Sequence, residues 1–171
     1  MRRLIASFAL LGALGQLGPA LAADGEPAAG KAGVRACSLL TKDLLAQHSP
    51  FEQAPAVERD QHRKLLGLIP PEEESIGPSG SACGFGGVYL QVDPFAAAAK
   101  TEADVAKMSE RVAGVGDVAY FRNNRGEYAE LYVRSGGHVI TLQMDTPQGR
   151  TPESIKPNAI ALAQAILPKL R

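Results

Sequence analysis

The sequence lacks any apolar run long enough to cross a bilayer as a stable helix. An apolar stretch over residues 4–14 follows two arginines and is itself followed by the small-residue segment 20–22. A basic start, a short apolar centre and a small-residue end are typical of a secretory signal peptide. We therefore expect residues 1–22 to direct export and to be removed after Ala22, leaving the mature chain in the periplasm or outside the cell.

The chain also lacks an excess of either charge, because 18 basic residues balance 18 acidic ones. Removal of the predicted signal peptide takes away two arginines, which leaves 16 basic residues against 18 acidic residues. Such a balance provides no electrostatic footprint for nucleic acid or for an anionic membrane surface. We expect neither a nucleic-acid partner nor a membrane span.

Cysteine is scarce, with Cys37 and Cys83 the only two residues of this type. Neither lies at the predicted cleavage point, which favours a free mature protein over a lipid-anchored one. An even pair in an oxidising compartment most simply forms a disulfide. The two cysteines are too far apart in sequence for the C-x-x-C arrangement of a redox site. A structural disulfide between Cys37 and Cys83 is therefore predicted.

Motifs of common catalytic sites are missing, since the sequence contains no H-E-x-x-H, G-x-S-x-G or S-x-x-K. The three histidines, His48, His62 and His138, lack the spacing of metal ligands on one helix face, and we interpret them as scattered structural or surface residues. Residues 114–119 match G-x-G-x-x-A, but a helix is expected before them and a strand after them, the reverse of a dinucleotide site. No catalytic, cofactor-binding or metal-binding residue is predicted.

The first half of the mature chain is predicted to form a leader followed by helices. Residues 23–35 are small, polar and interrupted by Gly and Pro, which predicts a flexible leader before a single domain over 36–171. Short helices are expected from Thr41 to His48, capped by the Thr41 hydroxyl, and from Pro55 to Leu66. The proline pair, three glutamates and Gly/Ser residues that follow, up to Ser81, predict an irregular surface loop.

The pattern changes from Cys83 onward to that of a strand. Apolar residues alternate through Val88, Leu90 and Val92, which indicates a half-buried strand. Cys83 lies on the opposite parity from these core positions, so a bulge at residues 86–87 is expected to reverse the alternation.

An alanine-rich helix is expected next. Asp93 and Pro94 provide its start, Thr101 marks a break or kink, and the glycines at 114 and 116 close it.

Three further strands are predicted over 118–122, 127–134 and 138–145, joined by hairpin turns. A last helix from Thr151 or Ser154 to Leu167 carries an apolar stripe suited to packing on a sheet. The predicted fold is therefore α+β, with a mainly antiparallel four-stranded sheet and helices packed on one face.

Strand parity separates a core face of the sheet from a polar face. The polar face is expected to carry Tyr89, Gln91, Asp93, Tyr128, Glu130, Tyr132, Arg134, Thr141 and Gln143. Tyrosine combines contact area with a hydrogen-bonding hydroxyl, so Tyr89, Tyr128, Tyr132 and Arg134 form a candidate interaction face. The simpler interpretation is a solvent-facing sheet that uses tyrosine for cross-strand pairing.

The opening Cys37-Ser38-Leu39-Leu40-Thr41, a second cysteine entering a strand, the segment 114–120 and the two-hairpin ending resemble a set of exported bacterial proteins of unknown function. Uncharacterised actinobacterial lipoproteins are among them. The resemblance implies a disulfide from the first helix to the first strand and an α+β sandwich. The chain departs from that group in lacking a lipidation cysteine and in its longer loop before Cys83.

These observations predict a small periplasmic or secreted protein that acts by binding an envelope protein, a peptide or a glycan, without a cofactor. Two alternatives stay open. One is a hydrolase-like enzyme with its site near the glycines that precede the first strand, and the other is an envelope inhibitor or immunity protein that uses Glu72 to Ser81 as a wedge. The oligomeric state is not predicted.

Overall fold

The computed structural model describes residues 33–76 and 80–170. The predicted signal peptide, residues 1–22, and most of the predicted leader lie outside the described residues. The helices are α1 (Ala36–Leu39), α2 (Lys42–His48), α3 (Ala56–Leu68), α4 (Phe95–Met108) and α5 (Pro152–Ile166), with 3-10 turns η1 (Pro50–Gln53) and η2 (Leu167–Leu170). The strands are β1 (Glu72–Ser75), β2 (Ser81–Phe85), β3 (Val88–Pro94), β4 (Glu110–Val112), β5 (Val118–Asn124), β6 (Tyr128–Ser135) and β7 (His138–Asp145).

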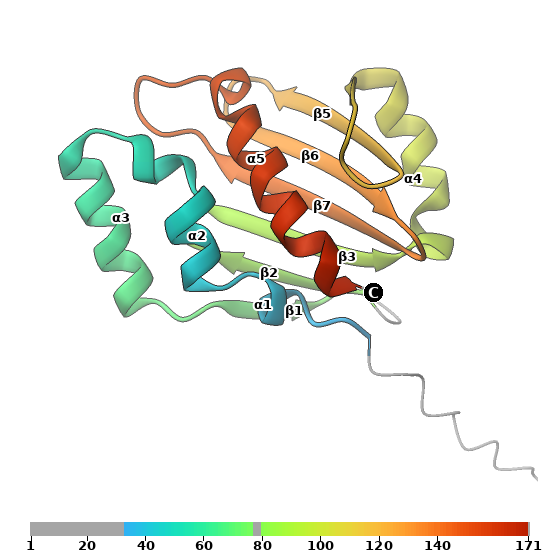
Figure 1. Ribbon diagram of the computed structural model, residues 1–171, viewed down its shortest axis with the longest axis horizontal. Helices are drawn as coiled ribbons and strands as arrows, with labels where there is room; N and C mark the ends of the chain where they lie inside the picture. Colours follow the sequence, from blue (N-terminus) through green and yellow to red (C-terminus); the bar gives the residue numbers. More distant parts are fainter. Residues whose placement is uncertain (1–32, 77–79, 171) are drawn as a thin grey trace, which may run out of the picture.

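All these strands form one antiparallel sheet in the order β1-β2-β3-β7-β6-β5-β4. Helices α1, α2 and α5 cover one face, with α5 running across the sheet (Figure 1). The predicted mixed fold with an antiparallel sheet is confirmed, but the sheet has seven strands and not four.

Two of the additional strands lie at the edges of the sheet. Residues 72–75, expected in an irregular loop, form β1 and pair with β2. All four are exposed, and charged side chains are common on an edge strand because they discourage pairing with another chain. Residues 110–112, expected within the preceding helix, form β4 at the other edge and pair with β5.

The third additional strand is β2, because a turn at the glycine pair after Cys83 divides the one expected strand into β2 and β3. The expected bulge at residues 86–87 is a two-residue hairpin turn instead, with φ of 57° at Gly86 and 71° at Gly87. Positive φ at both central residues is the requirement of a tight hairpin, which glycine meets without strain. Cys83 therefore lies in β2 directly opposite Leu90, and shares its core-facing side.

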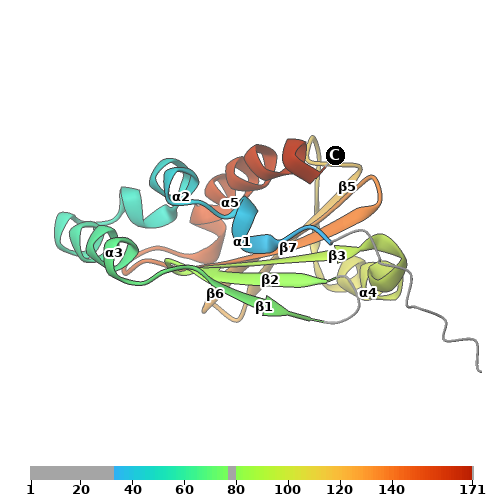
Figure 2. The same ribbon diagram turned by 90° about the horizontal axis from the view of Figure 1, so that it is seen from below.

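Helix α4 differs most from the expected arrangement. It runs without a break through Thr101, and the expected start at Asp93 and Pro94 belongs to β3. It also lies on the face of the sheet opposite α1, α2 and α5 (Figure 2). There Ala98 and Val105 pack on Tyr132 and Val139. The expectation that helices cover one face only is therefore wrong.

Helices α2 and α5 begin at the capping residues expected from the sequence. The Thr41 hydroxyl accepts a hydrogen bond from the Leu44 amide at 3.4 Å, and α2 ends at His48. A capping box formed by Thr151 and Ser154 starts α5. Helix α3 runs through Gly67, the expected stop, to Leu68.

The main core lies between the sheet and the layer of α1, α2 and α5. Five residues on the core-facing side of the strands are fully buried: Leu90, Leu131, Val133, Ile140 and Leu142. The apolar stripe of α5 packs against them through residues that include Ile155, Leu162 and Ile166. Burial of large aliphatic side chains of this kind contributes about 1.5–3 kcal/mol each.

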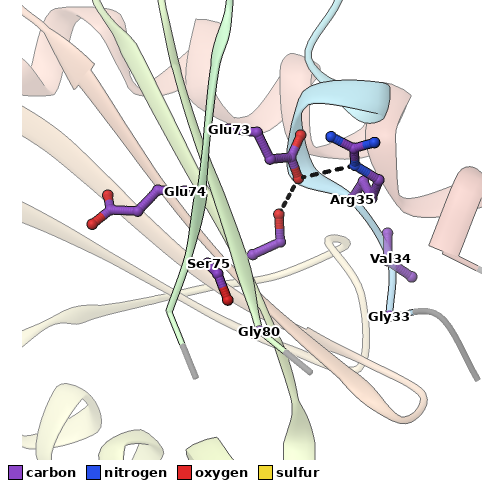
Figure 3. Close-up of a pocket in the computed structure, with 8 residues that line it drawn as sticks. Gly33, Val34, Arg35, Glu73, Glu74, Ser75 and Gly80 are labelled. Carbon is purple, nitrogen blue, oxygen red and sulfur yellow. Dashed lines mark hydrogen bonds and ion pairs between the residues drawn. The ribbon is translucent and has the colours of Figure 1, made fainter. Parts of the chain in front are cut away.

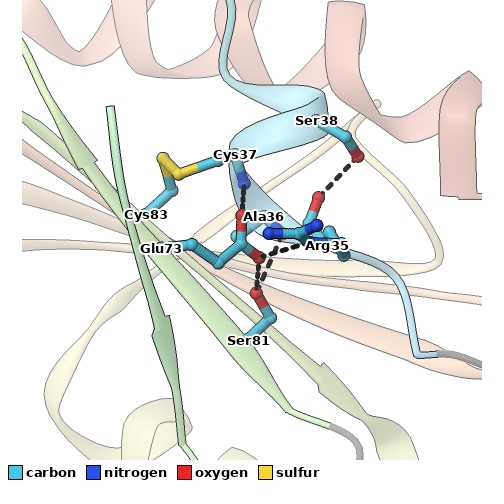
Figure 4. The surroundings of a disulfide bond; sticks show 7 residues. All are labelled: Arg35, Ala36, Cys37, Ser38, Glu73, Ser81 and Cys83. Atoms are coloured by element: carbon cyan, nitrogen blue, oxygen red, sulfur yellow. Dashed lines mark hydrogen bonds and ion pairs between the residues drawn. A yellow bond between two sulfur atoms is a disulfide. The ribbon is translucent and has the colours of Figure 1, made fainter. Parts of the chain in front are cut away.

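A disulfide joins Cys37 in α1 to Cys83 in β2, with 5.0 Å between the Cα atoms (Figure 4). Hydrogen bonds reinforce the connection. The Cys37 amide donates to Glu73 Oε2 at 3.0 Å, and the Ala36 amide donates to the Ser81 hydroxyl at 3.0 Å, which itself donates to Glu73. The first helix is thus fixed to the β1–β2 hairpin by one covalent bond and by a carboxylate at its amino end.

Because this disulfide closes a loop of 46 residues, loop-closure entropy predicts that it contributes about 4 kcal/mol to the free energy of unfolding. Urea unfolding with and without a thiol reductant should show a loss of this size. The double variant Cys37→Ser/Cys83→Ser should match the reduced protein and be insensitive to reductant. A loss below about 1 kcal/mol would contradict the assignment of a stabilising role.

Candidate functional site

The register of the strands places the expected polar residues on one face of the sheet. Directly opposite residues in antiparallel strands share a face, and Tyr89, Gln143, Glu130 and Arg122 form one continuous row across β3, β7, β6 and β5. A second row contains Gln91, Thr141, Tyr132 and Tyr120. The sequence pattern therefore predicted which side chains of β3, β6 and β7 share this face, although not the β5 residues beside them or what covers them.

Helix α4 covers one end of this face, and with it two residues of the candidate interaction face. Tyr132 is only 2% exposed, and burial together with the Glu102 carboxylate raises its pKa. Arg134 forms an ion pair with Glu102 at 3.0 Å, and its guanidinium lies 4.9 Å from the centre of the Phe95 ring. The expectation that Tyr132 lies on an open face is wrong, because both side chains attach α4 to the sheet.

A groove of about 700 Å³ remains where α4 stops covering the sheet. Its floor includes Gln91, Glu130 and Thr141, and its α4 wall includes Ala97, Thr101 and Asp104. Tyr89 and Tyr128 are half-buried and lie beyond this groove, where they line a separate hollow of about 250 Å³ on the same face. The polar face is thus divided into a covered part, a groove and an open end.

The floor of the groove holds charges in a fixed arrangement. Arg122 Nη2 donates to Glu130 Oε1 at 2.5 Å, and Gln143 Nε2 donates to Glu130 Oε2 at 3.2 Å. Gln91 Nε2 donates to Asp93 Oδ2 at 2.7 Å. Glu130 is only 6% exposed, so its carboxylate depends on these donors. Arg122 Nε is buried and makes no hydrogen bond to the described residues.

Among the described residues, none that lines this groove is a histidine, a serine or a cysteine. No group of three or more His, Cys, Asp or Glu side chains within 33–76 and 80–170 is placed to hold a metal ion. The three histidines lie apart, in α2, in α3 and at the start of β7. The described lining offers hydrogen-bonding and charged side chains.

The glycines near which a hydrolase site was expected have His62 as a neighbour. His62 Nε2 lies 2.9 Å from the Gly86 carbonyl, and a pocket beside them is lined by Phe51, Glu58, Gln61, His62, Leu65, Gly86, Gly87 and Asp145. No hydroxyl or thiol nucleophile is part of this lining. The 24-residue separation of His62 and Gly86 left no sequence signal for this contact.

A further hollow of about 250 Å³ lies between residues 33–35 and the β1–β2 hairpin (Figure 3). Glu73 points into it toward Arg35, whereas Glu74 points to the other side of β1 (Figure 3). The Glu73 carboxylate already accepts hydrogen bonds from Cys37 and Ser81. We interpret this hollow as a by-product of fixing α1 to the sheet. The described part of the predicted wedge, residues 72–75, is likewise a paired strand and not an irregular loop.

Comparisons with protein-family models, with curated proteins and with solved structures found no match. Among the described residues, no helix is long and apolar enough to span a membrane.

Substitution of Arg122 tests whether the groove floor is held by its ion pair. Arg122→Gln should lower the free energy of unfolding by about 1–3 kcal/mol, because the nearly buried Glu130 carboxylate loses its main donor. In a Glu130→Gln background, the same change should cost at least about 1 kcal/mol less. Urea unfolding of the four proteins measures this coupling, and strictly additive losses would contradict it.

Proposed function

We propose that this chain is an exported binding protein without catalytic activity, and that its ligand lies in the groove between α4 and the polar face of the sheet. The observation that carries the proposal is the partial cover of that face. An antiparallel sheet commonly leaves one face to solvent. Here α4 supplies a wall, and the groove of about 700 Å³ lies in the size range of ligand sites.

The lining suggests a polar ligand with both donors and acceptors. It carries cationic groups on Lys100 and Arg122 and anionic groups on Asp93, Asp104 and Glu130. The amide of Gln91 and the hydroxyls of Thr101 and Thr141 add neutral donors and acceptors. A peptide segment or a glycan of the cell envelope offers the matching mixture of groups, whereas a strongly charged polymer does not.

Export is part of the proposal and has two supports. The Cys37–Cys83 disulfide is typical of proteins that mature outside the reducing cytoplasm. The pattern of residues 1–22 has the composition of a signal peptide. The resemblance to exported bacterial proteins agrees with this location and adds no ligand.

A bulky side chain in the groove wall tests the proposal without disturbing the core. Ala97 and Ala99 are both exposed on α4, but only Ala97 lines the groove. Immobilised mature protein should retain envelope peptides or glycans, identified by mass spectrometry, and Ala97→Trp should abolish this retention.

Ala99→Trp is the matched control, since it adds the same ring to the same helix away from the groove. It should retain ligands as the unsubstituted protein does. Equal retention by the two tryptophan variants, both with unchanged circular dichroism, would overturn the assignment of the groove.

A further inference from the structure

A second surface lies at the far end of the molecule, on α3. This helix lies at the outer edge of the helical layer, on the side away from the chain's carboxyl end (Figure 1). Val57, Leu65 and Leu68 lie on one side of α3, and Ile69 follows its last turn. They are 72%, 50%, 69% and 50% exposed, and they are four of the five large apolar side chains exposed in the described part of the chain. We call these four residues the apolar strip.

The pocket lined by His62 adjoins this strip and shares Leu65 with it. Its volume is about 310 Å³. At its floor, a Cβ built on Gly87 would lie 2.8 Å from Phe51 Cε2 and 3.3 Å from Asp145 Oδ2, so only glycine leaves this space open. The rings of Phe51 and His62 are stacked, with 4.6 Å between their centres and 11° between their planes.

Two buried polar atoms beside this pocket have no hydrogen-bond partner among the described residues. The Gly86 carbonyl can only accept, so His62 Nε2 donates to it, and in that tautomer Nδ1 is the acceptor of the ring. His62 is 5% exposed, and its Nδ1 has no hydrogen-bond partner among the described residues. Glu58 Oε1 accepts from the Gln148 amide at 3.1 Å, whereas the buried Oε2 has no partner there.

The charge of the pocket is of one sign. Glu58 and Asp145 line it, and no lysine or arginine does. Arg59 and Arg63 of α3 form ion pairs elsewhere, with Asp60 at 3.8 Å and with Glu52 at 2.5 Å. Burial raises the pKa of Asp145, as expected for a carboxylate at the rim without a cationic partner.

From this geometry we propose that the α3 end binds a protein segment that places an arginine side chain in the pocket and apolar side chains on the strip. A guanidinium carries five donors and a positive charge, which suits a site with two carboxylates and unpaired acceptors. Its plane can also stack on an aromatic ring such as Phe51. Leucine-type neighbours of that arginine would cover the exposed strip, where apolar area is available for burial. This surface is distinct from the groove beside α4.

Titration with a short peptide tests the proposal directly. The probe is a blocked leucine–arginine–leucine–leucine peptide, and its control replaces arginine with citrulline, a neutral group of nearly the same shape. In ¹⁵N NMR spectra the arginine peptide should shift the amide signals of Gly86, Gly87 and Asp145, and should bind at least about five-fold more tightly than the citrulline peptide. It should also lower the pKa of Asp145, followed by its carboxyl carbon signal.

Matched variants distinguish binding in this pocket from a general attraction of the cationic peptide to the carboxylates of the protein. Asp145→Asn should weaken binding of the arginine peptide about five-fold, and Leu68→Ser should weaken it as well. Asp104→Asn removes the same charge from the α4 groove and should leave the affinity unchanged. Equal binding of the two peptides, equal effects of Asp145→Asn and Asp104→Asn, or signal shifts confined to the α4 groove would each overturn the proposal. Ala97→Trp should not affect this binding, so failure of the groove proposal remains distinguishable.

Discussion

The pairing of β3, β7, β6 and β5 is the constraint on which the rest of the structure depends. It aligns Leu90, Leu142 and Leu131 on one face and Tyr89, Gln143 and Glu130 on the other. A slip of one residue in any of these strands would exchange the two faces of that strand and expose its core residues. The apolar face requires the cover of α1, α2 and α5, whereas the polar face tolerates water. On that second face α4 packs on Tyr132 and Val139 and leaves a groove beside it.

The alternation of side chains made much of this arrangement predictable. Period-two patterns and glycine turns predicted strands over 118–122, 127–134 and 138–145, which match β5, β6 and β7 to within about two residues. The edge strands were not predictable in the same way, because Glu72 to Glu74, which pair with β2, have low strand propensity and no apolar alternation. The sequence also did not indicate which face of the sheet α4 covers. Its alanine-rich sequence carries a thin apolar stripe, and its attachment uses Tyr132 and Arg134, which read as surface residues.

Long-range polar contacts explain what else the sequence concealed. Glu73 looks like one member of a solvated acidic run, yet its carboxylate accepts the Cys37 amide at the start of α1. His62 looks like a scattered histidine, yet it contacts the Gly86 turn 24 residues away. Each contact joins a side chain to a backbone group far away in the sequence, and the residues next to either partner do not indicate the contact. The disulfide was the exception, because a sequence with two cysteines leaves one pairing within the chain.

We propose that this protein binds its ligand in the groove between α4 and the polar face of the sheet. Photo-crosslinking in the producing cells tests it most directly, with benzoylphenylalanine in place of Thr101, which lines the groove, or in place of Gln164, which is exposed on α5. The account predicts a discrete adduct at position 101 that is missing at position 164. An adduct of equal yield at both positions, or one at position 164 alone, would contradict it.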